Sequence, residues 1–510
     1  MTQSNRLNAG GRVNRDKPIR FTFNDKHYTG YEGDTVASAL LANGVDVVGR
    51  SFKYSRPRGI VTADAQEPNG ILQTGSNDAS TVPNPKATQA ALHPNMVCRS
   101  TNGWPNVDTD LMGLVGKVGG AAMPPGFYYK TFMYPQSMWM SYEKVIRKGA
   151  GLGASPTQGD PDIYDKFNHH CDIMVVGAGP AGLSAAVTAA RAGCRVLIAD
   201  EQEEMGGSLL CSTQSINGAA PSEWVSDMLA ELSANENVTL LPRSTVFGYF
   251  DHNYLSIAER RTDHLSETAN GVVRERMHKV RAKQVILATG AHERPLVYGN
   301  NDVPGCMLAS AVSTYINRYA VVPGNTLALM TTNDNGYRAA IDWHKAGKPV
   351  AVIADTRQTA DGDLVKEAKA LGISIKFGHA IINVKGSKRV KSVEVASISA
   401  DGSSVSGSAY QVYCDTVASS GGWSPVLHLS SHTGAKPVWR DDIQGFVPGK
   451  TVQAQHVCGG VNGVYPLADV LGDGAAVALN AVCSMKKSIE GVAIPQVAVE
   501  EVTESPSMAL

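Results

Sequence analysis

The sequence lacks an excess of charge of either sign, a long apolar run and an apolar N-terminal segment. Its 46 Lys and Arg residues nearly balance its 47 Asp and Glu residues, for a formal net charge of −1. Nothing therefore favours nucleic acid or a membrane surface as a partner, and we expect neither. No run of about 18 apolar residues occurs, which predicts no membrane span. The polar opening residues 1–6 predict no secretory signal.

Cysteine is scarce and scattered. The eight cysteines stand at 98, 171, 194, 211, 306, 414, 458 and 483, and none falls within four residues of another. This spacing excludes a CxxC redox pair, a zinc ribbon and a sequential iron–sulfur run. We therefore expect unpaired, buried thiols and a cytoplasmic location.

Glycine, by contrast, is abundant, with 51 glycines in 510 residues against an average of about 7%. The glycines cluster in short loops after apolar runs, which is typical of nucleotide-binding α/β folds. A chain of this length is expected to divide into about two to four domains. The balance of charge points to a small molecule or another protein as the partner.

The N-terminal hundred residues predict a small α+β module. Residues 20–31 alternate apolar and polar side chains around a turn at Asn24–Asp25, which indicates a β-hairpin. Residues 35–41 follow as a short helix. Residues 76–170 are rich in turn residues, yet their segment 126–134 is too aromatic for a flexible linker. We interpret it as a packed connector that ends in a hinge over 149–162.

From residue 171 the pattern predicts an α/β fold with two Rossmann-like dinucleotide-binding units, one inserted in the other. Apolar strands alternate with small-residue helices, and residues 417–422 and 456–460 are interpreted as returns to the first unit. The predicted domains are the module 1–100, the connector 101–170, the first unit 171–298 with 413–495, the second unit 299–412 and a polar tail 496–510.

The strongest motif is a phosphate-binding loop in the first unit. Gly177, Gly179 and Gly182 follow a buried strand and open a helix, so the loop can turn tightly, approach a pyrophosphate and pack the helix against the strand. Asp200 ends the next strand, where a carboxylate accepts from a ribose hydroxyl. Glu201 beside it adds charge that repels a 2′-phosphate. The loop predicts NAD or FAD rather than NADP; the alternative is an empty, vestigial fold.

The second unit departs from this pattern. Its loop reads Thr331-Thr332-Asn333-Asp334-Asn335-Gly336, with only the third glycine retained and a carboxylate near the would-be pyrophosphate. Asp355 still ends the next strand. We interpret this unit as kept for packing, which disfavours an NADPH-driven reductase.

Four further features stay open between a site and a structural role. Cys211 has no partner cysteine and is interpreted as a structural thiol. His292–Glu293 is either an acid–base pair or a polar strand end. His169–His170 is interpreted as solvated linker rather than a metal site. The tract Lys53 to Arg58 is interpreted as a ligand or interface contact rather than a plain basic loop.

These motifs resemble the alpha subunit of heterotetrameric sarcosine oxidase. The resembling segments run through nearly the whole chain: 49–59, 102–105, 126–133, 177–182, 288–295 and 420–425. The resemblance implies an oxidoreductase that converts sarcosine to glycine and reduces oxygen to hydrogen peroxide. It implies FAD in a beta subunit, FMN where alpha and beta meet, and NAD in this chain, with smaller gamma and delta subunits completing the heterotetramer.

The resemblance also assigns cofactor contacts residue by residue. The implied NAD contacts are Gly177, Gly179, Pro180, Ala181, Gly182, Asp200, Glu201, Gly207, Ser208, Gly290, Gly460, Tyr465 and Leu467. No catalytic residue and no metal ligand is assigned. The implied NAD is structural, which agrees with the absence of an obvious hydride-acceptor motif.

Two departures from the family pattern matter. Related amine dehydrogenase subunits hold a 2Fe–2S cluster through C-x4-C-x2-C in a ferredoxin-like module, but here those positions are Thr62, Glu67 and Gly70. We therefore expect this ferredoxin-like module to lack its cluster. Family alpha subunits also continue into a folate-binding domain, which is missing from these 510 residues. Folate chemistry is accordingly not assigned to this chain.

Three hypotheses follow. The chain is the NAD-binding part of a sarcosine oxidase alpha subunit, with amine oxidation in the beta subunit. Alternatively it is the alpha subunit of an opine, proline or hydroxyproline dehydrogenase with its own redox dinucleotide. In the third hypothesis it is a non-catalytic scaffold that a dinucleotide stabilises.

Overall fold

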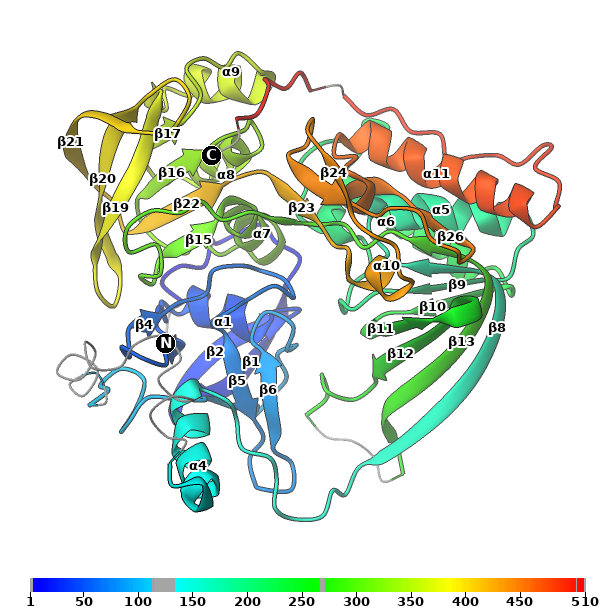
Figure 1. The fold of residues 1–510 in the computed structure, drawn as a ribbon, viewed down its shortest axis with the longest axis horizontal. Helices are drawn as coiled ribbons and strands as arrows, with labels where there is room; N and C mark the ends of the chain where they lie inside the picture. The colour runs from blue at the N-terminus through cyan, green and yellow to red at the C-terminus, as the bar shows by residue number, and fades with distance from the viewer. Residues whose placement is uncertain (1–2, 112, 114–133, 267–270, 501, 509–510) are drawn as a thin grey trace.

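The computed structural model describes residues 3–111, 113, 134–266, 271–500 and 502–508. Three sheet-containing regions follow one another along the described chain (Figure 1). They are an N-terminal module, a first Rossmann-like unit and a second Rossmann-like unit. The predicted α/β class is confirmed, and the connector segment 126–133 lies outside the described residues.

The N-terminal module is a five-stranded sheet in the order β2-β1-β7-β5-β6. The predicted hairpin is present, with Asn24 and Asp25 at positive φ in its turn. The predicted helix begins after Thr35, whose side chain accepts from the amide of Ser38 in a capping box. The elements are β1 (Asn14–Phe23), β2 (Lys26–Glu32), α1 (Val36–Ala42), β3 (Gly49–Arg50), β4 (Pro57–Arg58), β5 (Ile71–Thr74), β6 (Val82–Lys86) and β7 (Val97–Ser100).

The stretch after the module holds a helix and the first half of a strand that the sequence pattern does not predict. Helix α4 (Trp139–Ala150) has no fully buried residue. Strand β8 begins at Ile163, well before the predicted domain start at 171. His169 and His170 therefore lie in a strand, and the linker interpretation is wrong. The reason is that only the last residues of β8 are apolar; its first half is paired yet exposed.

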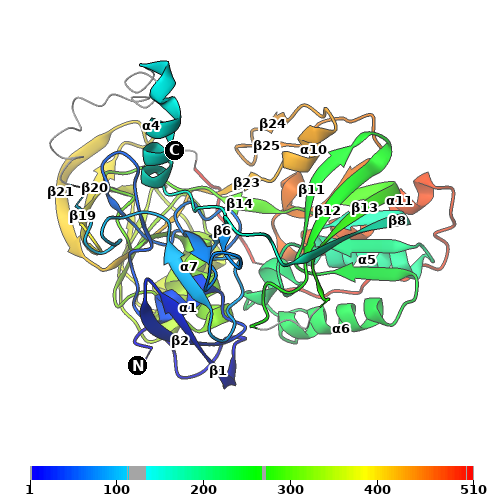
Figure 2. The same cartoon turned by 90° about the horizontal axis from the view of Figure 1, so that it is seen from below.

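The first Rossmann-like unit has the strand order β10-β9-β8-β13-β12-β11, with β26 also paired to β13. Strands β8, β9, β10, β13 and β26 run parallel, while β12 is antiparallel to both of its neighbours, β13 and β11. Figure 2 shows α5 and α6 together on one side of this sheet. The elements are β8 (Ile163–Val176), α5 (Pro180–Arg191), β9 (Val196–Ala199), α6 (Pro221–Ser233), β10 (Val238–Leu241), β11 (Ser244–Phe250), β12 (Tyr254–Arg260), β13 (Val273–Leu287), β26 (Gln455–Val457) and α11 (Leu467–Ser484).

The second unit has the parallel strand order β15-β22-β16-β17-β18, beside a three-stranded antiparallel sheet β19-β20-β21. Its helices α7, α8 and α9 follow β15, β16 and β17. The elements are β15 (Cys306–Leu308), α7 (Ala309–Tyr319), β16 (Leu327–Thr331), α8 (Gly336–Lys345), β17 (Val350–Asp355), α9 (Asp363–Ala370), β18 (Ile375–Phe377), β19 (His379–Gly386), β20 (Val390–Ile398), β21 (Val405–Tyr413) and β22 (Thr416–Ser420).

The predicted return at 417–422 is wrong. Strand β22 lies in the second unit, between β15 and β16, with Leu327 opposite Thr416 and Thr331 opposite Ser420. The predicted segment 413–495 of the first unit therefore starts with a strand of the second. A short apolar strand buried on both faces has the same sequence pattern in either sheet. Its sequence therefore does not indicate which strands it pairs with. The return at 456–460 is present as β26, which pairs with β13.

Between these units lie small connecting elements, and a shared core joins the module to the second unit. Apolar residues of α1 and of α7 belong to one buried cluster, and the Tyr315 hydroxyl donates to the Thr62 carbonyl at 2.8 Å. Both views show α1 next to α7 (Figures 1 and 2). The connecting elements are β14 (Ala291–Glu293), β23 (Trp423–Pro425), α10 (His428–His432), β24 (Val438–Arg440) and β25 (Gly445–Val447).

Helix α11 is the single described helix that has the length and composition of a membrane span, with a mean hydropathy of 1.3. It packs closely on α5: a Cβ on Gly474 would lie 2.2 Å from the Ala181 carbonyl oxygen. Its buried residues join the core of the first unit.

Candidate functional site

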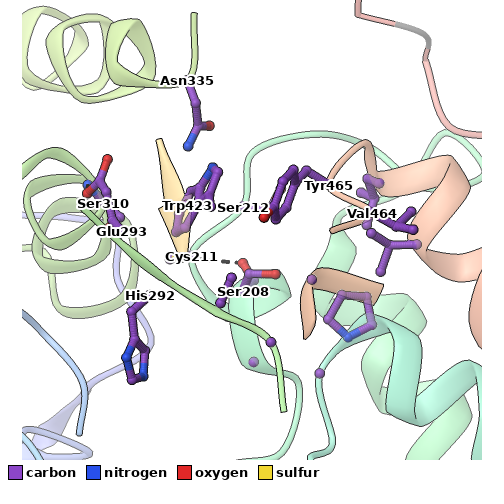
Figure 3. A pocket seen from close by; sticks show the side chains of 18 of the residues that line it. Ser208, Cys211, Ser212, His292, Glu293, Ser310, Asn335, Trp423, Val464 and Tyr465 are labelled. Carbon is purple, nitrogen blue, oxygen red and sulfur yellow. Dashed lines mark hydrogen bonds between the residues drawn. The ribbon is translucent and has the colours of Figure 1, made fainter. Parts of the chain in front are cut away.

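A cavity of about 1630 Å³ lies between the two Rossmann-like units. It is larger than the usual small-molecule pocket of about 300–1,000 Å³. Its walls include the 177–182 loop, the start of α7, the degenerate loop before α8 and the start of α11. Figure 3 shows Glu293 and Ser310 on one side of it and Tyr465 on the other, with Trp423 between them.

The phosphate loop has the geometry that a dinucleotide needs. Gly177 has φ +97°, and a Cβ there would lie 2.4 Å from the Ala288 carbonyl oxygen. A Cβ on Gly182 would lie 1.9 Å from the Gly177 carbonyl oxygen, so this glycine is needed for helix packing. At Gly179, by contrast, a Cβ would meet no protein atom closer than 3.9 Å. The fold itself therefore leaves room for a Cβ at Gly179, and a bound dinucleotide could approach the backbone closely there.

The start of α5 is suited to an anion. The helix begins at Pro180 after Gly179, and no side chain caps its first amides. These amides and the helix dipole face the cavity that Gly179, Pro180 and Ala181 line. A pyrophosphate would satisfy them. The residues therefore fit the phosphates of NAD or FAD.

Asp200 holds the phosphate loop in place. One of its carboxylate oxygens accepts from the Ala178 amide at 2.7 Å, and the other accepts from the Gln202 amide at 2.8 Å. Burial raises the pKa of Asp200. The carboxylate lines the cavity and keeps lone pairs for a ribose hydroxyl.

The structure brings the remaining predicted contacts to the same cavity. Gly182 is the exception, because it packs inside the fold. The other twelve line the wall: Gly177, Gly179, Pro180, Ala181, Asp200, Glu201, Gly207, Ser208, Gly290, Gly460, Tyr465 and Leu467. Trp423, which sequence reasoning left unassigned, joins them with its ring 6.3 Å from that of Tyr465. Its only sequence signal is the tract 420–425, which carried the family resemblance.

His292 and Glu293 do not form an acid–base pair. They are successive residues of β14, so their side chains point to opposite faces, as Figure 3 shows. Glu293 is buried, and its carboxylate accepts from the Ser310 amide at 2.7 Å near the start of α7. Burial raises the pKa of Glu293, whereas burial and nearby His428 lower the pKa of His292. The strand-end interpretation is the one that the geometry supports.

Cys211 lies in the cavity wall, where its thiol is hydrogen-bonded. Its Sγ contacts the Ser208 carbonyl at 3.3 Å, and the Thr314 hydroxyl donates to Sγ at 3.5 Å. Burial raises its pKa, which opposes thiolate formation. All eight cysteines are unpaired; six are buried, Cys211 is partly exposed and Cys483 is exposed.

The basic tract of the module contacts the chain itself. Arg56 and Arg58 both pair with the carboxylate of Asp302 in the segment that leads into the second unit. Lys53 lies over the ring of Tyr54 at 4.7 Å. The tract therefore serves as a contact between module and second unit.

The second phosphate loop is filled by an internal ion network. Asp334 and Asp355 each pair with Arg357 at 2.7 Å, and all three side chains are no more than 5% exposed. The Tyr337 hydroxyl donates to Asp355 at 2.7 Å. The carboxylate that would bind ribose in an active unit is thus engaged by the protein.

The C-terminal segment covers the same loop and is not a loose polar tail. The Ser505 amide donates to Asp334 at 2.7 Å, and the Met508 amide donates to the Thr332 carbonyl at 2.9 Å. Arg357 donates to the Pro506 carbonyl at 3.2 Å. Figure 1 shows this red segment crossing from α11 to α8 and α9. The chain itself thus lies where a second dinucleotide would bind.

Comparison with known proteins agrees with this architecture. The family described as pyridine nucleotide-disulphide oxidoreductase matches residues 171–484, and a 2Fe-2S iron-sulfur cluster binding domain matches residues 16–103. The chain therefore belongs to the pyridine nucleotide-disulphide oxidoreductase family. A solved structure of L-proline dehydrogenase from P. horikoshii has the same fold, with a TM-score of 0.61 and 18% identity over 96% of this chain and 77% of that one.

Among curated proteins the chain is 42% identical to the alpha subunit of a sarcosine oxidase from Rhizobium meliloti (strain 1021), over 99% of this chain and 50% of the relative. The resemblance predicted from the motifs is confirmed, and the chain spans about half the length of that relative. It is also 27% identical to one of the subunits of an opine oxidase from Agrobacterium tumefaciens (strain Ach5), over 60% of this chain and 62% of the relative.

The donor set of the N-terminal module does not fit a 2Fe–2S cluster. Four thiolates hold such a cluster, yet Cys98 is the only cysteine between residues 16 and 103. It is buried in β7, and burial raises its pKa to about 12. At the predicted ligand position, Glu67 instead accepts from the amides of Val61 and Thr62 at 2.9 and 2.8 Å, and from those of Asn69 and Gly70. A carboxylate thus organises this loop.

Proposed function

We propose that this chain is the NAD-binding part of a sarcosine oxidase alpha subunit. In this proposal the amine is oxidised at FAD in a beta subunit, and FMN lies where alpha and beta meet. Oxygen is reduced to hydrogen peroxide, and smaller gamma and delta subunits complete the heterotetramer. This chain binds the dinucleotide and helps to enclose the flavin, in the cytoplasm.

The observation that carries the proposal is the contrast between the two phosphate loops. The first loop presents uncapped helix amides to a cavity, with a carboxylate at the strand end. In the second, Arg357 pairs with both carboxylates and the C-terminal segment is hydrogen-bonded to the loop. A reductase that passes hydride from NADPH to FAD needs both sites. One open site favours a single dinucleotide that is held rather than turned over.

The substrate assignment is supported by sequence similarity to known proteins rather than by the residues of the cavity. The sarcosine oxidase relative is 42% identical over 99% of this chain. The opine oxidase relative is 27% identical over 60% of this chain. The unpaired cysteines support a reducing compartment. NAD, FMN and the beta subunit follow from the family resemblance.

The first experiment identifies the nucleotide. The full chain is purified alone, denatured, and the released compound is identified by mass spectrometry and absorbance. Colourless protein that releases NAD supports the proposal. A yellow protein that releases FAD contradicts it and favours the opine or proline dehydrogenase class.

The second experiment tests the substrate. The chain is co-expressed with candidate beta, gamma and delta subunits and with a chain carrying the folate-binding domain. The assembled, flavin-loaded complex is assayed for peroxide formation with sarcosine and, as a matched control, with proline. Peroxide from sarcosine supports the proposal. An assembled complex that oxidises neither amine would support the non-catalytic scaffold instead.

A further inference from the structure

The N-terminal module reaches into the dinucleotide cavity at its adenosine end. Asp64 and Gln66, in the loop after β4, line the cavity beside Asp200 and Glu201 of the first unit. The sequence marks neither residue, because a site built across two modules leaves no spacing pattern. The module that matches an iron–sulfur domain therefore contributes side chains to the cavity that the phosphate loop lines.

A hydrogen-bonded chain fixes Asp64 in this position. Gln202, two residues after Asp200, donates its amide to Asp64 at 3.2 Å. Arg318 from α7 donates to the other end of Gln202 at 2.6 Å. The module, the first unit and the second unit thus meet around one carboxylate. Its placement depends on the fold as a whole rather than on a flexible loop.

The carboxylates of Asp64, Asp200 and Glu201 share one low-dielectric region. Burial raises the pKa of Asp64 and of Glu201, and the charges on Asp64 and Asp200 raise the pKa of Glu201 further. The nearby cations are Arg318, which lowers the pKa of Asp64, and Arg260, which lowers that of Glu201. Like charges held together in this way are unfavourable unless a ligand donates hydrogen bonds to them.

We propose that Asp64 is a specificity-determining residue of the dinucleotide site, and that with Asp200 and Glu201 it selects an adenosine ribose with free hydroxyls over one with a 2′-phosphate. The inference rests on the proposed function, because it assumes that the dinucleotide binds at the 177–182 loop. It adds a residue from the N-terminal module to the selection that Asp200 and Glu201 provide.

The physical basis is the opposite response of the two ligands to the same charge. Ribose hydroxyls donate charge-assisted hydrogen bonds to carboxylates. A 2′-phosphate carries about −1.5 to −2 charges near neutral pH, and each carboxylate repels it at an effective dielectric far below that of water. Removal of one carboxylate therefore weakens NAD binding and relieves repulsion of NADP. Both changes lower the ratio of the two affinities.

The test is a pair of titrations on the full chain. Bound nucleotide is removed, and NAD⁺ and NADP⁺ are titrated by calorimetry into wild type and Asp64→Asn. The control is Asp25→Asn, in the same module, whose side chain is 82% exposed. We expect Asp64→Asn to lower the ratio of the NAD⁺ affinity to the NADP⁺ affinity by at least about tenfold. Asp25→Asn should leave the ratio unchanged.

A second variant separates charge from structure. Asp64→Glu retains the carboxylate and should keep a ratio nearer to wild type than that of Asp64→Asn. Equal thermal unfolding midpoints of the nucleotide-free variants establish that each is folded. If Asp64→Asn is unfolded, Asp64→Ala, which also removes the charge, carries the same titrations with the same expected fall in the ratio. A ratio that no variant alters overturns the inference alone, whereas wild type that binds neither nucleotide overturns the proposed function with it.

Discussion

The carboxylate of Asp200 accepts a hydrogen bond from the backbone amide of Ala178 at 2.7 Å. This contact joins the end of the second strand of the first unit to the middle of its phosphate loop. The residue that the sequence motif assigns to the ribose therefore also determines the position of the loop that binds the phosphates. Loss of its charge should affect both ends of the same ligand.

Asp200→Asn should weaken dinucleotide binding by about tenfold to a hundredfold, because charged hydrogen bonds contribute about 1.5–3 kcal/mol and an amide has only one acceptor oxygen. The measurement is calorimetric titration of NAD⁺ into the nucleotide-free chain. Asp25→Asn, on the exposed turn of the module, is the control. An unchanged Kd would show that Asp200 contacts neither ligand nor loop in a way that matters.

Two glycine substitutions should distinguish a residue that contacts the ligand from one that the fold requires. Gly179 has φ −75° and an open Cβ position, so Gly179→Ala should leave unfolding stability unchanged or raise it by about 0.4–1 kcal/mol while nucleotide affinity falls. Gly182→Ala places a Cβ 1.9 Å from the Gly177 carbonyl and should destabilise the unit itself. Urea unfolding and nucleotide titration of both variants check this. Full affinity in Gly179→Ala would mean that the loop is not the site.

Arg357→Met should destabilise the second unit without affecting nucleotide affinity. The substitution leaves the buried carboxylates of Asp334 and Asp355 unpaired, and loss of one partner from a buried pair costs about 3–5 kcal/mol. Lys366→Met is the control, because its pair with Asp363 is exposed and should contribute little to stability. Urea unfolding measures the free energies. Equal effects of the two substitutions would contradict the buried network.

The pair His169 and His278 should make stability sensitive to acid. Nε2 of His169 lies 2.8 Å from Nδ1 of His278, whose Nε2 lies 2.9 Å from Glu259. Burial and the charge that His278 carries when protonated lower the pKa of His169. As pH falls below about 6.5, the unfolded chain binds a proton that the folded chain still refuses, so stability is lost until pH reaches the folded pKa.

His169→Asn should therefore show a smaller loss of unfolding free energy than wild type between pH 7 and pH 5, by at most about 1.4 kcal/mol per pH unit of the window. Denaturant unfolding at several pH values gives the comparison. His27→Asn, at an exposed position on β2, is the control and should follow wild type. Parallel curves for His169→Asn and wild type would contradict the pKa assignment.

Local patterns predicted the elements that depend on neighbours in sequence. The hairpin around Asn24, the helix after Thr35 and the βαβ unit around Gly177 are all present, because alternation, caps and glycine spacing act within a few residues. The failures concern distant partners. The prediction places residues 417–422 in the wrong sheet, and it places His169–His170 in a linker. The local sequence of either segment does not show which strand it is hydrogen-bonded to.

The same division applies to the site. Glycine spacing and a strand-end carboxylate are local, so the sequence alone specifies a phosphate loop at 177–182 with Asp200 beside it. Three other features depend on tertiary packing. They are the position of Asp64 at the cavity, the pairing of Arg357 with two carboxylates, and the path of residues 502–508 across the second loop. Only the assembled chain decides that one loop stays open while its own backbone covers the other, since the contact between Ser505 and Asp334 joins residues 171 positions apart.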